Sequence, residues 1–279
     1  MDTSSQTYDL ENGPEHPYHL VNPSVWPLAS AFAAGLLAVG GVLYMHEVEV
    51  FGMPVGLKGA VIGLLAVLGC MFFWWKDVIH ESVKERAHTK VAKIGFRYGM
   101  TLFIASEVMF FFAFFWAFFH AAYYPSEAIG GIWPPADIEA IPAFDLPFLM
   151  TMILLLSGCT LTWAHHEIIE GNQKEFLRGL GLTVILGIIF TGLQAYEYHH
   201  AAFGFGANIY TSTFYMATGF HGFHVLVGTI FLAVCWFRGR KGHFTQKSHF
   251  GFEAAAWYWH FVDVVWLFLF ASVYWWGGA

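Results

Sequence analysis

The sequence predicts an all-α membrane protein with seven transmembrane helices. Only 12% of its 279 residues are charged and 57% are hydrophobic, whereas about a quarter of the residues of a soluble domain are charged. Seven apolar windows approach or exceed the roughly 20 residues that a helix needs to cross a hydrocarbon core. None of them alternates polar and apolar residues as a membrane-barrel strand does, so helices should satisfy their backbone hydrogen bonds.

The seven windows follow one another along the chain, with polar segments between them. In order, they are 26–45, 59–75, 98–123, 146–164, 179–196, 213–237 and 254–276. The residues before the first window are polar and acidic rather than basic and then apolar. They therefore predict a tail and not a removable signal peptide. Gly59 and Gly63 are four residues apart, as are Gly95 and Gly99, a spacing typical of close helix contact and equally of a flexible helix end.

Lys and Arg gather on alternate connections, and this asymmetry predicts the orientation in the membrane. The connections on one side hold Lys or Arg at positions 76, 84, 86, 90, 93, 97, 174, 178, 238, 240, 241 and 247. The opposite connections, 124–145 and 201–212, contain neither residue type. We therefore expect a cytoplasmic N-terminus and an external C-terminus, with Lys58 as the one exception.

Two acidic residues fall deep inside windows, where inserting a charged acid costs on the order of 3 kcal/mol. Glu107 is about ten residues into the third window, which corresponds to roughly 15 Å of helix. Asp263 is similarly deep in the seventh window. Each could belong to a proton path or could be a structural acid that hydrogen-bonds to a neighbouring helix. A path should show several polar residues at helical spacing, and the third window offers mainly phenylalanine around Glu107.

The 15 histidines suggest a metal or haem site, because neutral imidazole is the commonest metal ligand. His221 and His224 are the best candidates, since they lie three residues apart near the middle of the sixth window. The three cysteines fall in three different windows and form no metal-binding pattern. The alternative is that these histidines make interhelical hydrogen bonds. In that case His221, His224 and Asp263 are the candidate polar partners of Glu107.

An aromatic and charged cluster follows the second window. Its members, with further cations after the sixth window, are Trp74, Trp75, Lys76, His80, Glu81, His88, Arg238, Arg240, Lys241 and His243. Together these side chains supply the donors that a phospholipid head group requires. A solvated basic loop is the alternative interpretation.

Several ordered motifs resemble subunit III of the haem-copper cytochrome c oxidases, over about residues 16–278. They are HLVNPS (19–24), RYGM (97–100), SEV (106–108), TWAHH (162–166), ATGFHG (217–222), GFE (251–253) and WYWHFVDVVW (257–266). The resemblance implies two helices and then five, around a V-shaped cleft that holds phospholipids. It divides the chain into a cytoplasmic tail (1–24), a two-helix bundle (25–76), a cytoplasmic loop (77–96) and a five-helix bundle (97–276).

The resemblance also implies an accessory subunit without catalytic residues, cofactors or metals of its own. Haem a, haem a3 and copper would belong to the partner subunits I and II, cytochrome c would be met only indirectly, and no nucleic acid would bind. The carbodiimide-reactive acid of the family falls on Glu107. The lipid-binding positions fall on Trp75, His80, Glu81, His88, Arg238, Lys241 and His243. The family commonly has arginine in place of His80, and histidine binds phosphate less firmly.

We therefore expect a multi-pass protein of the cell inner membrane, or of the mitochondrial inner membrane if it is organellar. Its task would be to stabilise an oxygen-reducing, proton-pumping complex and to sustain proton uptake. One alternative is subunit III of a quinol oxidase, a branch that typically lacks the first two spans. The others are a membrane metalloenzyme and a transporter or channel. Broken helices would favour the last, and no window has proline at its centre.

Overall fold

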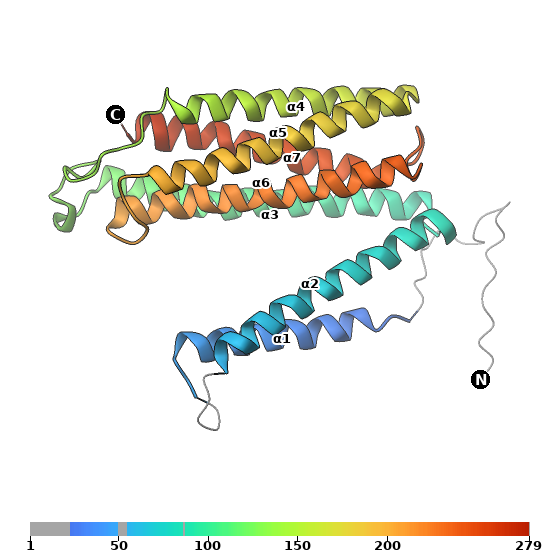
Figure 1. Ribbon diagram of the computed structural model, residues 1–279, viewed down its shortest axis with the longest axis horizontal. Helices are drawn as coiled ribbons and strands as arrows, with labels where there is room; N and C mark the ends of the chain where they lie inside the picture. Colours follow the sequence, from blue (N-terminus) through green and yellow to red (C-terminus); the bar gives the residue numbers. More distant parts are fainter. Residues whose placement is uncertain (1–22, 50–54, 86, 279) are drawn as a thin grey trace. The chain divides into compact units, whose positions relative to one another are not determined.

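The computed structural model describes residues 23–49, 55–85 and 87–278 (Figure 1). In these residues the regular structure is helical, apart from one isolated bridge between Thr245 and Ser248. Seven of the described helices are long and apolar enough to cross a membrane. The structure confirms the predicted all-α class with seven transmembrane helices. The tail 1–22, most of the HLVNPS motif and Arg86 lie outside the described residues.

The described residues form seven long helices and three short helical segments. In chain order, they are α1 (Trp26–Met45), α2 (Gly56–His80), η1 (Glu81–Glu85), α3 (Lys90–Tyr123), η2 (Glu127–Ile129), α4 (Leu146–Glu170), α5 (Gln173–His200), α6 (Ile209–Arg240), α7 (Phe250–Leu269) and η3 (Phe270–Trp276). The segments η1 and η3 are π-helical and η2 is a 3-10 helix.

Helical structure extends well beyond the apolar windows. The expected loop 77–96 is mostly helical, because α2 and η1 continue to Glu85 and α3 begins at Lys90. The helices therefore extend past the ends of the apolar windows. Hydropathy marks only the residues that suit hydrocarbon, whereas a helix continues into the polar interface as long as its backbone finds hydrogen-bond partners.

The chain divides into two compact units, Met1–Phe96 and Arg97–Ala279. In the first unit, glycines bring α1 and α2 into backbone contact. A Cβ at Gly40 would overlap the backbone of Gly59 and Ala60, and one at Gly63 would overlap the backbone of Leu37. Gly63 therefore serves close helix contact, as its spacing allowed. At Gly95 and Gly99, a Cβ would meet no described atom within 4 Å.

A tryptophan joins the beginning of α1 to the end of α2. The Trp26 indole Nε1 donates a 2.5 Å hydrogen bond to Asp77 Oδ2, and its ring stacks on Phe73 with centroids 5.7 Å apart. Because Asp77 lies outside the apolar window, this polar contact should sit at the level of the head groups.

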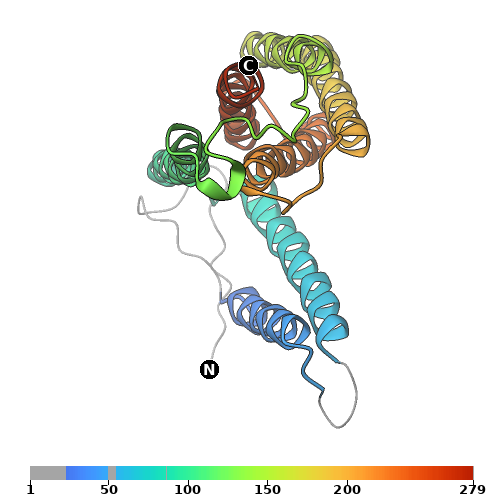
Figure 2. The ribbon, with the colours of Figure 1, turned by 90° about the vertical axis from the view of Figure 1, so that its left-hand side faces the viewer.

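The second unit is a bundle of α3 to α7 in which α7 is the most buried span. The α4–α5 and α6–α7 turns lie at one end of this bundle, and the α3–α4 and α5–α6 connections lie at the other (Figure 1). Seen end-on, α7 lies among α3, α4 and α6 (Figure 2).

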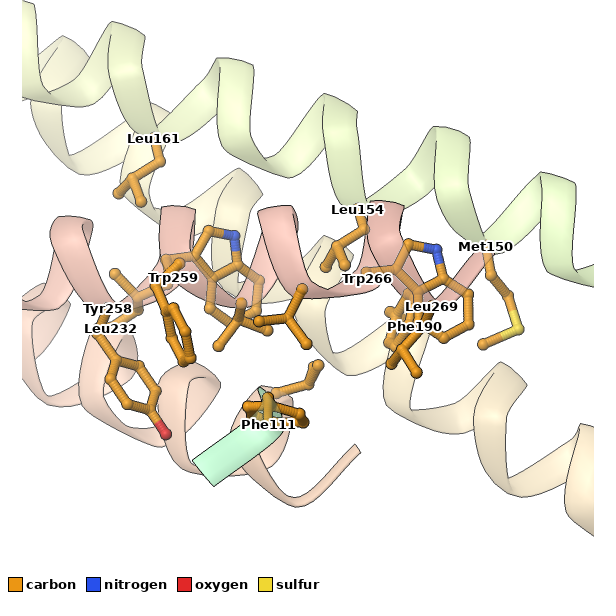
Figure 3. Close-up of a cluster of buried hydrophobic side chains, with 14 of the residues drawn as sticks. Phe111, Met150, Leu154, Leu161, Phe190, Leu232, Tyr258, Trp259, Trp266 and Leu269 are labelled. Atoms are coloured by element: carbon orange, nitrogen blue, oxygen red, sulfur yellow. The ribbon is translucent and has the colours of Figure 1, made fainter. Parts of the chain in front are cut away.

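Two tryptophans of α7 lie in the bundle core and hydrogen-bond to α4 (Figure 3). Trp259 Nε1 donates to Ser157 Oγ of α4 at 2.9 Å, and Trp266 Nε1 donates to Thr151 Oγ1 at 2.9 Å. A Cβ at Gly228 of α6 would come within 2.8 Å of the Trp259 ring. Glycine at this position thus leaves room for the Trp259 ring.

The connection between α3 and α4 folds onto the end of the bundle. Gly130 and Gly131 take positive φ values of 78° and 68°, which glycine adopts without steric cost. The Trp133 ring then packs 5.3 Å from Phe118 and 5.1 Å from Tyr210, measured between centroids. The segment is a compact turn.

Candidate functional site

Glu107 of α3 lies against His224 of α6. The distance between Glu107 Oε2 and His224 Nε2 is 2.9 Å, and the other ring nitrogen, Nδ1, lies 2.6 Å from the carbonyl oxygen of Phe220. A carbonyl only accepts, so Nδ1 carries a proton. Nε2 therefore either accepts a proton from the neutral acid or donates one to the carboxylate. In both forms one proton lies between the two side chains.

Aromatic rings surround this pair. The His224 ring lies 5.0 Å from the Phe111 ring and is stacked 6.1 Å from the Tyr258 ring of α7. The side chain of His224 is 9% exposed and that of Glu107 is 20% exposed. With little water to compete, the hydrogen bond joins α3 to α6, and such bonds contribute about 0.6–2 kcal/mol in membrane proteins.

His221 has a different partner. Its side chain is fully buried, and Nε2 lies 3.2 Å from the carbonyl oxygen of Val262 in α7. Its ring packs on Trp266 with centroids 5.0 Å apart. Among the described residues, Nδ1 has no hydrogen-bond partner. His221 therefore joins α6 to α7 and does not contact Glu107.

Asp263 belongs to a separate polar group between α4 and α7. Its Oδ2 lies 3.6 Å from His260 Nδ1, and a Cβ at Gly158 of α4 would come within 2.5 Å of the same oxygen. The other ring nitrogen of His260 lies 3.3 Å from Thr162 Oγ1. The close approach of the carboxylate to α4 depends on Gly158, and the structure does not join Asp263 to Glu107.

A third buried acid, Glu197 of α5, was not among the predicted site residues. Its Oε1 accepts hydrogen bonds from Tyr274 Oη at 2.7 Å and from Gln194 Nε2 at 3.0 Å, and the residue is 4% exposed. Gln194 and Glu197 stand one helical turn apart, which is a signal that the sequence contains. Tyr274, 77 positions further on, could not be anticipated.

An ion pair joins residues of two motifs named above. Arg97 Nε and Nη2 donate to the two carboxylate oxygens of Glu253, at 3.1 and 2.9 Å. Two parallel hydrogen bonds of this kind fix orientation as well as distance. Arg97 begins the RYGM motif and Glu253 ends GFE, so the contact ties the first residues of this unit to the start of α7.

The predicted lipid-binding residues fall in both units. In the first unit, the Trp75 side chain is exposed, His80 Nε2 lies 3.8 Å from Glu85 Oε1, and the His88 ring packs on Phe96. Glu81 begins η1.

In the second unit, the predicted lipid-binding residues surround the turn after α6. The Arg238 guanidinium lies 4.5 Å from the centre of the Phe244 ring, and the backbone N–H groups of Lys241 and His243 both donate to the carbonyl oxygen of Arg238. These three residues therefore form a local group. A head-group site built from both units stays a prediction.

Within the described residues, no group of three or more His, Cys, Asp or Glu side chains could hold a metal ion. His221 and His224 turn toward different helices, and hydrogen bonds to Val262 and to Glu107 occupy them. Their arrangement fits interhelical hydrogen bonding better than metal binding.

A model of the family "Cytochrome c oxidase subunit III" matches residues 16–278. The chain belongs to this family. Cytochrome c oxidase subunit 3 of Arabidopsis thaliana is 55% identical over 263 residues, which cover 94% of this chain and 97% of the relative. The proteins of the same name from Prototheca wickerhamii and Chondrus crispus are each 55% identical, over 95% of this chain and 99% and 95% of the relatives.

Membership of the subunit III family settles several alternatives. The predicted resemblance is confirmed, and the chain is a multi-pass membrane protein of a family named for cytochrome c oxidase. A transporter or channel is not supported. The roles of Glu107 and of the lipid-binding residues stay predictions, because family membership does not identify a functional residue.

Proposed function

We propose that this chain is the accessory, non-redox subunit III of an oxygen-reducing, proton-pumping cytochrome c oxidase. In that complex, subunits I and II carry haem a, haem a3 and copper, and cytochrome c reaches the complex without binding this chain. The near full-length match to the family, over residues 16–278, carries the proposal. The match spans all seven helices, so it concerns the whole protein and not one motif.

The surface of α3 supports a role in assembly. A row of large apolar side chains is more than 45% exposed along this helix: Tyr98, Leu102, Phe103, Val108, Met109, Phe112 and Trp116. In a membrane such a row contacts lipid tails or other apolar helices, among them those of another subunit. Subunits I and II would cover part of this surface, and their contacts would restrain the catalytic helices in return.

The charge distribution supports an orientation with the N-terminus in the cytoplasm. In the second unit, Lys174, Arg178, Arg238, Arg240 and Lys241 all lie near the α4–α5 and α6–α7 turns, at one end of the bundle. Residues 124–145 and 201–208, at the other end, contain neither Lys nor Arg. By the positive-inside rule the first end faces the cytoplasm. The phospholipid and proton-uptake roles rest on the resemblance to the family.

Copurification tests the proposal directly. An affinity-tagged full-length chain, extracted in mild detergent, should bring down two further subunits and the absorption bands of haem a. Mass spectrometry should identify a haem-copper subunit and a binuclear-copper subunit in near-stoichiometric amounts. Quantitative recovery of this chain alone, with haem a in a separate fraction, would contradict the proposal.

A further inference from the structure

An open groove of about 590 Å³ runs along the second unit where α4, α5 and α6 meet. This volume is within the range of about 300–1,000 Å³ that is typical of small-molecule sites. Most of its wall is apolar, and Leu177, Leu182 and Ile185 of α5 form one side of it. The groove shares no residue with the predicted lipid-binding set.

Two arginines mark one end of this groove. Arg178 lies near the start of α5, and Arg240 is the last residue of α6, so both stand close to the α4–α5 and α6–α7 turns. Ile185 is seven residues beyond Arg178, which places it about 10 Å deeper along the helix. The groove therefore has a charged mouth at a helix end and an apolar floor toward mid-membrane.

The cationic mouth is held in place by its neighbours. The Arg240 guanidinium lies 5.0 Å from the centre of the Trp236 ring, and Trp236 Nε1 donates to the carbonyl oxygen of Leu177 at 3.0 Å. A guanidinium over an aromatic face keeps its N–H edge available. No described residue accepts a hydrogen bond from the Arg240 side chain.

Arg178 is positioned by one acid and retains donors. Its Nη1 lies 2.5 Å from Glu175 Oε1, and no other described residue accepts from its side chain. With Glu175 ionised, the groove lining carries two positive charges and one negative charge. The net charge of +1 matches one phosphodiester anion, and guanidinium groups bind phosphate oxygens with directed hydrogen bonds.

We propose that this groove binds one anionic phospholipid, with its phosphate between Arg178 and Arg240 and one acyl chain against Leu182 and Ile185. Basic pockets between transmembrane helices recognise such lipids. A zwitterionic lipid carries its own cation and gains less from a net positive mouth. A helix of another subunit would leave both guanidinium groups without acceptors unless it supplied an acid at this depth. The proposal requires only that the unit spans a membrane.

Photolabelling tests the site in the full chain with whatever subunits accompany it. The purified protein is reconstituted in phosphatidylcholine nanodiscs that contain a minor fraction of phosphatidylglycerol with a photoactivatable acyl chain. The comparison probe is phosphatidylcholine with the same acyl chain. We expect the anionic probe to label peptides that contain Leu182, Ile185 or Trp236 several-fold more than the neutral probe does.

Two variants, each with a matched control, distinguish the contribution of the arginine charges from that of the open groove. Arg178→Gln with Arg240→Gln should lower anionic labelling to the level of the neutral probe, whereas Lys174→Gln with Lys247→Gln removes equal charge outside the groove and should not. Ile185→Trp should block labelling by filling the groove. Ile188→Trp, at a position that is also exposed on α5 but outside the groove, should leave it intact.

Three results would overturn the proposal. Equal labelling by the two probes in the unmodified protein would mean ordinary boundary lipid. Unchanged labelling in the double arginine variant would remove the arginines from the site. Crosslinking of groove residues to another protein would mean that a polypeptide fills it. If the arginine variant fails to fold, the two tryptophan variants decide alone. None of these readouts depends on oxidase activity, so they stand apart from the copurification test.

Discussion

His224 illustrates how a polar side chain is accommodated deep in this bundle. One ring nitrogen bonds to the carbonyl oxygen of Phe220 in its own helix, and the other bonds to Glu107 in α3. His221 and Trp259 likewise have partners on neighbouring helices. In hydrocarbon no water can replace a missing partner. The main role of a deep polar residue in this chain is therefore to hydrogen-bond a neighbouring helix.

Glu197 offers a test of this view at the level of single residues. Glu197→Gln keeps an oxygen that can accept from Tyr274 and Gln194, so the stability of the protein should change little. Glu197→Leu leaves both donors buried without an acceptor, which costs about 1–3 kcal/mol. Unfolding by sodium dodecyl sulfate in mixed micelles measures the difference. Glu139→Leu, at an exposed position without a described partner, is the control, and equal stability of both Leu variants would contradict the account.

The sequence could identify the deep polar residues but not pair them. Glu107 is recognisable by its depth alone, and the candidate partners His221 and His224 are both visible. A turn of about 300° over three residues leaves their side chains about 60° apart, so they face different helices. Which one meets α3 depends on the rotation of α6 in the bundle. That rotation results from packing contacts such as Gly228 against Trp259, and hydropathy does not report it.

At the level of elements, glycine decides how closely α1 and α2 pack. A Cβ at Gly63 would overlap the backbone of Leu37, while one at Gly69 would meet no described atom of another element within 4 Å. Gly63→Leu should therefore force the helices apart and destabilise the protein by about 1–3 kcal/mol. Gly69→Leu in the same helix should be tolerated. The measurement is the temperature at which half of the chain is lost from the monodisperse peak in mild detergent, and similar losses for both variants would contradict this packing.

The existence and order of the seven helices were predictable, because hydrocarbon imposes length and composition on every span. Their ends were not. The polar residues of η1 and of the first turns of α3 carry no hydropathy signal, yet they continue the helices beyond the apolar windows. The glycine spacing was informative only in part. Gly63 serves close contact between α1 and α2, whereas a Cβ at Gly99 would meet no described atom of another element within 4 Å.

At the level of the whole molecule, lipid retention can be tested at Arg238. Its guanidinium lies over Phe244 beside Lys241 and His243. Arg238→Ala removes the central cation of this group, so the purified complex should retain less phospholipid and lose activity sooner during turnover, while its initial rate stays near the wild-type value. Lipid phosphorus and the time course of oxygen consumption measure both effects. Lys247→Ala, which removes an exposed cation of the α6–α7 turn, is the control, and an Arg238→Ala complex with wild-type lipid content and lifetime would exclude a lipid site there.

The central claim is that the deep polar residues of this chain hold helices together and carry neither electrons nor obligatory protons. Glu107 gives the most direct test of this claim, because one proton already lies between its carboxyl group and His224. Glu107→Gln keeps the size of the side chain and a hydrogen-bond donor for His224 Nε2. It also removes the acid that a hydrophobic carbodiimide modifies, so labelling at this position should disappear.

The deciding measurement is the number of protons ejected per electron by the purified complex in reconstituted vesicles, compared between Glu107→Gln and the wild type. An amide cannot release and regain a proton at neutral pH, so the variant separates a structural hydrogen bond from a proton carrier. The account predicts an unchanged ratio together with the loss of carbodiimide labelling. A ratio that falls to the value of a non-pumping enzyme would contradict it.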